Sequence, residues 1–230
     1  MSSGDAIDIP LLKEAVEWNN LTAALRGDGP LLNQAYLDAL VAGALAGRFA
    51  MAPGRNIYRA RVMPFEQEDY ADPLPAEDTG PPSAAADVKA GRFNRHGVPY
   101  FYGAMERETA IAEVRGRRAR ISVARFMSTS TLSFTDLTGN VAGSTPTPHV
   151  RWLSFMLGRP VDERDEDRYL ASQRIADECR AAGLTGIFYD SSLAPGGVNV
   201  MLFDHAGVAC QDKELYEVTG VSYEAQRLWP

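Results

Sequence analysis

Cysteine and histidine, which most often hold metals or crosslink chains, are scarce in this 230-residue sequence. It contains two cysteines, Cys179 and Cys210, and three histidines. No CxxC or HxxxH spacing occurs, so we expect neither a metal site nor a disulfide framework. Because a chain without a disulfide pattern is typical of a reducing compartment, we expect a cytoplasmic protein.

The sequence also lacks long apolar runs and an excess of positive charge. Its apolar runs are shorter than the ~20 residues of a membrane helix, and MSSGDAIDIP has acidic residues where a signal peptide is basic. We therefore expect no membrane insertion and no export. With 23 basic and 30 acidic side chains, the net charge is −7. This balance argues against direct nucleic acid binding but allows a small anion in a local basic cleft.

Three familiar catalytic signatures are absent. There is no G-x-S-x-G elbow, no Walker A loop and no G-x-G-x-x-G fingerprint. These absences exclude an α/β-hydrolase triad, a P-loop site and a Rossmann dinucleotide site in their usual forms.

Apolar periodicity divides the chain into an N-terminal extension, residues 1–50, and a main domain, residues 51–230. Residues 10–26 and 31–47 carry apolar side chains at helical spacing around the turn GDGP, which predicts a helical hairpin. We expect the hairpin to be a packing appendage, with partner binding or a homodimer as alternatives. Residues 66–90 are acidic and contain four prolines, so a surface loop without a helix or inner strand is expected.

Strands and helices alternate irregularly in the main domain, which predicts an α+β fold. The predicted strands are NIYRARVMP, VPYFYG, ARISVARFM, TLSFTDLT, GIFYDSS and GGVNVMLFD, and the predicted helices are MERETAIAEVR, HVRWLSFML and DRYLASQRIADECRAAG.

Two arginines are candidates for binding an anion. Arg59 lies on a predicted strand after an aromatic residue, and Arg92 lies in the turn GRFN with Asn94. A guanidinium meets phosphate in a planar fork, and backbone donors of a turn can add to it. Taken singly, each arginine is better explained by an ordinary structural role, such as a surface charge or a salt bridge, than by ligand binding.

Three further polar residues stand at strand ends or on a helix. Glu113 lies at the edge of the apolar helix face of Ala110 and Val114. A carboxylate in such a place costs free energy unless it is paired, hydrogen-bonded or used in function. Such a carboxylate can stabilise an oxocarbenium-like transition state or bind ribose hydroxyls. Tyr102 and Ser191 each follow or end a strand, and each alone is explained by packing or a turn.

Taken together and in order, these motifs resemble the RES domain family, named for its Arg, Glu and Ser. The resemblance covers about residues 55–210 and is carried by YR, then GRFN…G.PYFYG…ETAIAEV, then Y.ASQ…GLTGIFYDSS…GGVNVMLF. The family pattern ends in a Y-x-S strand end ahead of an N-x-x-x-F strand. Phe93 stands where the family usually has tryptophan, and the 66–90 loop is long for the family.

The resemblance implies a fold similar to ADP-ribosyltransferases, with a mixed sheet core and surrounding helices. It also implies an NAD+-degrading toxin controlled by an antitoxin of the Xre type, whose helix-turn-helix binds DNA and which plugs the active site. In this sequence Arg59, Tyr102, Glu113 and Ser191 match the family's named residues, and Arg92 matches the arginine of its turn. NAD+ enters as substrate, so no cofactor is implied.

The expected reaction is cleavage of the nicotinamide–ribose bond. Arg59 and Arg92 are expected to clamp the pyrophosphate or its ribose, and Tyr102 to stack near nicotinamide. Glu113 would stabilise the ribosyl cation or orient the acceptor, and Ser191 would hydrogen-bond the ribose or carboxamide. Water, phosphate or a protein side chain stays open as acceptor. The alternatives are an ADP-ribosyltransferase and a non-enzymatic binding module on the same fold.

Overall fold

The computed structural model describes residues 9–64, 72–80, 88–114, 120–139, 147–157 and 166–220. Its helices are α1 (Ile9–Arg26), α2 (Gln34–Ala46), α3 (Ala76–Thr79), α4 (Arg107–Glu113), α5 (Pro148–Leu157), the 3₁₀ turn η3 (Glu166–Tyr169) and α6 (Leu170–Ala181). Its strands are β1 (Arg48–Met51), β2 (Asn56–Val62), β3 (Phe101–Ala104), β4 (Arg120–Ser128), β5 (Leu132–Asp136), β6 (Gly186–Asp190), β7 (Val198–Leu202) and β8 (Val208–Glu217). None of the described helices is long and apolar enough to span a bilayer.

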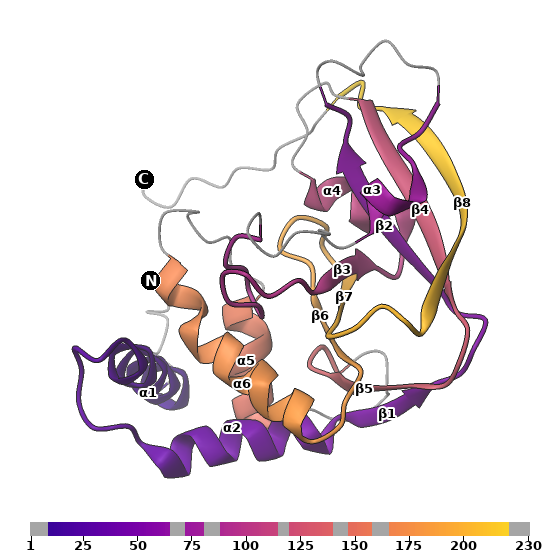
Figure 1. Ribbon diagram of the computed structural model, residues 1–230. Coiled ribbons are helices and arrows are strands. Elements are labelled where there is room, and N and C mark those ends of the chain that lie inside the picture. The colour runs from indigo at the N-terminus through magenta and orange to yellow at the C-terminus, as the bar shows by residue number, and fades with distance from the viewer. Residues whose placement is uncertain are drawn as a thin grey trace, which may run out of the picture.

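The strands form one eight-stranded mixed sheet in the order β1-β5-β6-β7-β3-β2-β4-β8. The pair β5 and β6 is parallel, and the other neighbours are antiparallel. Helices α1, α2, α5 and α6 gather beside one part of the sheet, and β2, β4 and β8 extend away from them (Figure 1). This arrangement confirms the predicted α+β class with a mixed sheet and surrounding helices.

Both faces of the central strands are buried. Ile187 and Met201 belong to the core under the helices, whereas their neighbours Phe188 and Val200 belong to a second apolar cluster. Since successive strand residues point to opposite faces, β6 and β7 carry apolar side chains on both faces, with Asp190 at the end of β6 and Asn199 in β7 as the polar exceptions. Such largely apolar runs make these two strands easy to recognise from the sequence.

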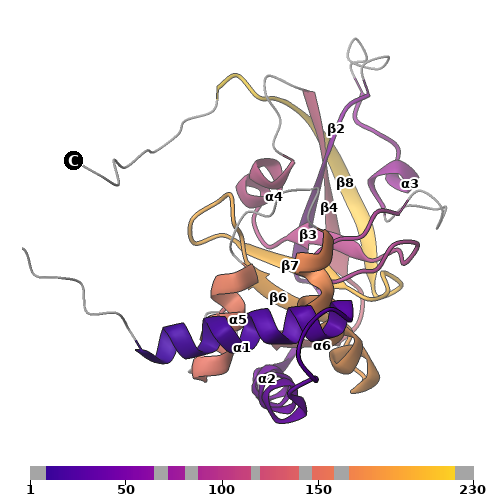
Figure 2. The ribbon, with the colours of Figure 1, turned by 90° about the vertical axis from the view of Figure 1, so that its left-hand side faces the viewer.

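The N-terminal segment forms the two predicted helices, but they do not form a hairpin, because α1 and α2 run crosswise to each other (Figures 1 and 2). Asn33 begins α2 by accepting a hydrogen bond from the Tyr36 backbone N–H at 3.2 Å, as N-cap residues do. Leu21 of α1 and Leu40 of α2 are buried in the same core cluster as Ile175 of α6. Figure 2 shows α1 lying across α5 and α6. The two helices therefore pack into the main core, and the chain enters the sheet directly afterwards at β1.

Three elements differ from the prediction. The strands β1 and β8 have no counterpart among the predicted strands. The expectation that residues 66–90 contain no helix is wrong for Ala76–Thr79, because Pro75 stands at the N-cap, where a proline interrupts no helical hydrogen bond. Of this loop, residues 65–71 and 81–87 lie outside the described part of the chain.

The sheet opens between β2 and β3. Strand β2 pairs with β4 at seven positions but with β3 at the single pair Tyr58–Ala104. Gly103 permits the close approach there, because a Cβ at this position would lie 2.7 Å from Ile57 Cγ2 and 2.8 Å from the Tyr58 carbonyl oxygen. Beyond this point β2 and β3 diverge (Figure 1), and the candidate site lies where they separate.

Candidate active site

A cleft of about 470 Å³ lies at the divergence of β2 and β3. Its walls come from β2, β3, α4 and the turn around Arg92, with Asn199 of β7 and three tyrosines from β2, η3 and β6. Its charged lining residues are Arg59, Arg61, Arg92 and Glu113. In a chain whose net charge is −7, three arginines against one glutamate make this cleft locally basic.

Arg59 is the most buried charge in the cleft, with 8% of its surface exposed. Its Nη1 donates to the carbonyl oxygen of Tyr102, and its guanidinium lies over the Phe101 ring at 5.0 Å. Among the described residues no carboxylate pairs with it, and its Nε has no hydrogen-bond partner. Burial lowers the pKa of Arg59 to about 9, with a smaller contribution from the positive charge of Arg61. A desolvated guanidinium without a counterion is suited to an anionic ligand.

Arg92 belongs to a turn that α6 holds in place. Gln173 donates to the carbonyl oxygens of Gly91 and Asn94, both at 2.9 Å, and the Ser172 hydroxyl donates to the Arg92 carbonyl oxygen. The Arg92 guanidinium lies over the Tyr189 ring at 5.6 Å. It forms no ion pair within the described chain, so its fork of donors stays available to the cleft.

Tyr102 lines the cleft, and its hydroxyl is hydrogen-bonded within the protein. The hydroxyl donates to Asn94 Oδ1 at 2.8 Å and accepts from the Phe93 N–H at 3.1 Å. Burial raises the pKa of Tyr102. Asn94 itself lies outside the cleft lining, with its amide nitrogen donating to the Lys89 and Arg95 carbonyl oxygens at 2.9 and 3.1 Å. The predicted binding residue Asn94 thus contacts Tyr102 and the turn.

Glu113 is held by two donors at the C-terminal end of α4. Ser191 Oγ donates to Glu113 Oε1 at 2.6 Å, and Asn199 Nδ2 donates to the same oxygen at 2.7 Å. Glu113 Oε2 accepts no hydrogen bond from the described residues. Ser191 does not line the cleft; its Oγ also accepts from the Leu193 and Ala194 N–H groups. One carboxylate oxygen is therefore fixed, and the other is left for a ligand.

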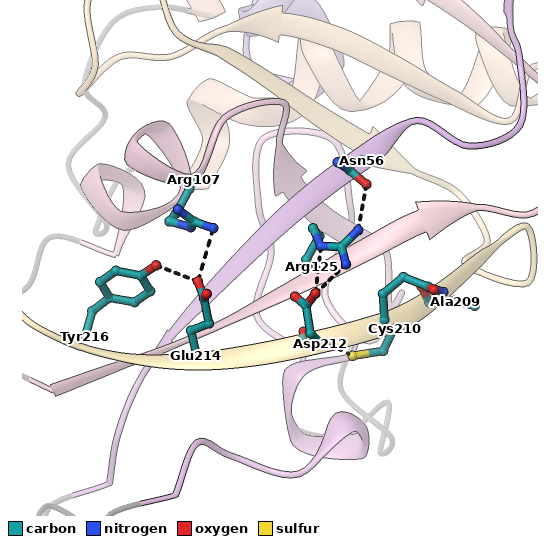
Figure 3. Close-up of polar contacts among 9 residues, drawn as sticks. Asn56, Arg107, Arg125, Ala209, Cys210, Asp212, Glu214 and Tyr216 are labelled. Carbon is teal, nitrogen blue, oxygen red and sulfur yellow. Dashed lines mark hydrogen bonds and ion pairs between the residues drawn. The ribbon is translucent and has the colours of Figure 1, made fainter.

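The N-terminal end of α4 is anchored on β8. Figure 3 shows Arg107 reaching Glu214, at 3.1 Å, and Tyr216 donating to the same carboxylate. The Arg107 guanidinium also lies 5.6 Å from the rings of Tyr58 and Tyr216. Because Arg107 begins the seven-residue helix that ends at Glu113, this contact fixes the helix that carries the carboxylate.

Several cleft residues were not among the candidates from the sequence. Arg61 could have been found, because it alternates with Arg59 on one strand. Asn199 is 2% exposed, and a lone amide in the apolar strand VNVML is a signal for a buried polar role. Tyr169 and Tyr189 line the cleft from elements far apart in the sequence. No group of three metal-ligating side chains occurs within the described ranges.

The fold and the cleft define an α+β protein with a basic pocket and one anchored carboxylate. A comparison with family models matches the RES domain over residues 56–223, and the chain belongs to the RES domain family. No curated protein matches the sequence. Among solved structures, the chain is similar to one in the M. tuberculosis MbcT–MbcA toxin–antitoxin complex. That similarity has 17% identity and a TM-score of 0.46, and it covers 79% of this chain and 93% of the other.

Proposed function

We propose that this protein cleaves the nicotinamide–ribose bond of NAD+. The observation that carries the proposal is the cleft itself, in which the unpaired, buried Arg59 and the anchored Glu113 face the same space. The pyrophosphate of NAD+ is anionic and needs a positive charge such as that of Arg59. The ribosyl carbon becomes cationic as nicotinamide leaves and needs a negative charge such as that of Glu113. Membership of the RES domain family supports the same assignment.

In the proposed reaction, nicotinamide leaves with the electron pair of the glycosidic bond. Its ring loses its positive charge, so the leaving group needs no proton, and positive charge develops on the ribosyl carbon. Glu113 Oε2, free of protein partners in the described chain, stabilises that charge. Arg59 and Arg92 bind the pyrophosphate through their guanidinium forks. The ring of Tyr102 supplies an aromatic surface for nicotinamide.

The geometry changes the proposed role of Ser191. Its hydroxyl is engaged with Glu113 at 2.6 Å, so we assign it the positioning of the carboxylate. Asn199 shares this role from the opposite strand. Two donors on one oxygen set the direction in which the second oxygen points, as preorganised electrostatic catalysis requires.

The acceptor of the ribosyl group defines the reaction class. Water gives a glycohydrolase, inorganic phosphate gives a phosphorylase, and a protein side chain gives an ADP-ribosyltransferase. In keeping with the family resemblance, we propose that the protein is a toxin restrained by an antitoxin of the Xre type that covers the cleft. Coexpression with the product of an adjacent helix-turn-helix gene would test this partner.

The activity is tested by mixing purified protein with NAD+ and measuring free nicotinamide with and without phosphate. Glu113→Gln keeps an oxygen that can accept the bonds from Ser191 and Asn199, so the fold should persist while turnover falls ~10²–10³-fold. Glu108→Gln is the matched control, because Glu108 is an exposed residue of the same helix. Wild-type turnover in Glu113→Gln, or equal losses in both variants, would contradict the assignment.

A further inference from the structure

A third arginine lines the cleft without a role in the reaction proposed above. Arg61 lies two residues beyond Arg59 on β2, so the two side chains leave the strand on the same face about 7 Å apart. Arg61 Nη2 donates to the carbonyl oxygen of Gly80 at 3.1 Å. Its Nε is buried and has no hydrogen-bond partner among the described residues.

The charge of Arg61 is poorly compensated by the protein. Burial lowers the pKa of Arg61, while the negative charge of Asp78 opposes that change from a distance. Asp78 is exposed on α3 and forms no ion pair with Arg61. The Arg61 charge in turn contributes to the lowered pKa of Arg59. Two guanidiniums thus stand near each other without a carboxylate between them, a situation that favours anion binding.

The charges of NAD+ do not balance those of the cleft. Three arginines face one glutamate, and NAD+ brings two negative phosphates and a positive nicotinamide ring. One positive charge is left over when NAD+ is bound. A phosphomonoester dianion would more than offset this excess, because it changes the sum from +1 to −1 in a site where charges are weakly screened.

We propose that Arg61 forms a second phosphate subsite, separate from the pyrophosphate clamp of Arg59 and Arg92, and that it binds a phosphomonoester dianion. Guanidinium forks match phosphate oxygens in this manner. The phosphate has two sources, the 2′-phosphate of NADP+ or free inorganic phosphate. The inference rests on the proposed dinucleotide cleft, but binding of inorganic phosphate is measured without any turnover.

The test compares Arg61→Gln with Arg55→Gln. Arg55 is exposed just before β2, and its hydrogen bonds within the described chain come from its backbone: its N–H donates to Ser128 Oγ and its carbonyl oxygen accepts from the Ser128 N–H. Arg55→Gln therefore removes the same charge outside the cleft. Inorganic phosphate is titrated into each protein by calorimetry. NAD+ and NADP+ are then titrated in phosphate-free buffer on the Glu113→Gln background, so that binding is measured without cleavage.

We expect Arg61→Gln to raise the dissociation constant of either inorganic phosphate or NADP+ about ten- to a hundredfold, because one or two charged hydrogen bonds are lost. A higher dissociation constant for inorganic phosphate identifies the free anion as the ligand. A loss of tighter NADP+ binding relative to NAD+ identifies the 2′-phosphate. Arg55→Gln should leave every constant unchanged.

Three results would overturn the subsite. Arg61→Gln could change no constant, it could weaken NAD+ and NADP+ equally without affecting phosphate, or Arg55→Gln could have the same effect. Failure of the proposed reaction looks different. In that case the wild-type protein releases no nicotinamide, while phosphate binding still depends on Arg61.

Discussion

Replacing Arg59 by methionine should leave the free protein as stable as before, or make it more stable. Arg59 is 8% exposed, and among the described residues it has one hydrogen-bond acceptor, the Tyr102 carbonyl oxygen, and no counterion. Methionine has a similar length and no charge to desolvate. A buried charge of this kind lowers the stability of the free protein, and such destabilising residues are common at sites where a ligand binds the charge.

The magnitude follows from three contributions. At about 1.4 kcal/mol per pKa unit, lowering the Arg59 pKa from 12.5 to about 9 opposes the charged form by about 5 kcal/mol. The substitution removes this cost. It also loses a charged hydrogen bond worth about 1.5–3 kcal/mol and the contact with the Phe101 ring, worth about 1–2 kcal/mol. The variant should therefore equal the wild type or exceed it by up to about 2.5 kcal/mol.

Urea unfolding of both proteins without ligand measures this difference. Unfolding is then repeated with ADP-ribose, which at a hundred times its Kd should stabilise the wild type by about 2.7 kcal/mol and Arg59→Met much less. Arg107→Met is the comparison, because Arg107 has a counterion in Glu214, and we expect that variant to lose about 1 kcal/mol. If Arg59→Met lost 2 kcal/mol or more without ligand, Arg59 would be a structural residue and our argument would fail.

Two further substitutions or modifications test the site and the core. Ser191→Ala removes a donor to Glu113 and the acceptor of the N–H groups at 193–194, so kcat should fall about ten- to a hundredfold and stability by about 1–2 kcal/mol; an unchanged kcat would show that Glu113 needs no anchor. Burial raises the pKa of Cys179 from 9.0 to about 12, so stability should fall as pH rises from 9 towards 12, because the unfolded thiol ionises first. At pH 8 a disulfide reagent should modify Cys210 in the native protein and Cys179 only in denaturant, and rapid modification of both would contradict this packing.

The sequence predicts most elements because their signals are local. Apolar runs mark β6 and β7, and Gly183, with φ of 78°, follows the C-cap of α6 as a glycine commonly does. The edge strands are different. Strand β8 carries Gln211, Asp212, Lys213 and Glu214 in succession, and charges of this kind protect an exposed edge but hide the alternation that identifies a strand.

The predicted site residues Arg59, Arg92, Tyr102 and Glu113 all line one cleft, whereas their partners could not be inferred. Ser191 and Glu113 are separated by 78 residues, and their contact depends on the register of several strands. Side-chain identity alone cannot say whether Ser191 faces a ligand or another side chain. The sequence therefore identifies the candidate residues, but the register of the strands determines which of them contact each other.

The opening of the sheet and the placement of Arg59 have a common physical origin. Where β2 leaves β3 after the Tyr58–Ala104 pair, the carbonyl oxygen of Tyr102 takes its hydrogen bond from Arg59 Nη1, and a buried carbonyl needs such a donor. A guanidinium has five N–H donors in a rigid fork, so it can bind this carbonyl and still present donors to an anion. A lysine has one nitrogen and could not do both with fixed geometry. The hydrogen bond from Arg59 to the Tyr102 carbonyl oxygen thus supplies a donor where β2 and β3 separate, and it also orients the Arg59 guanidinium in the cleft.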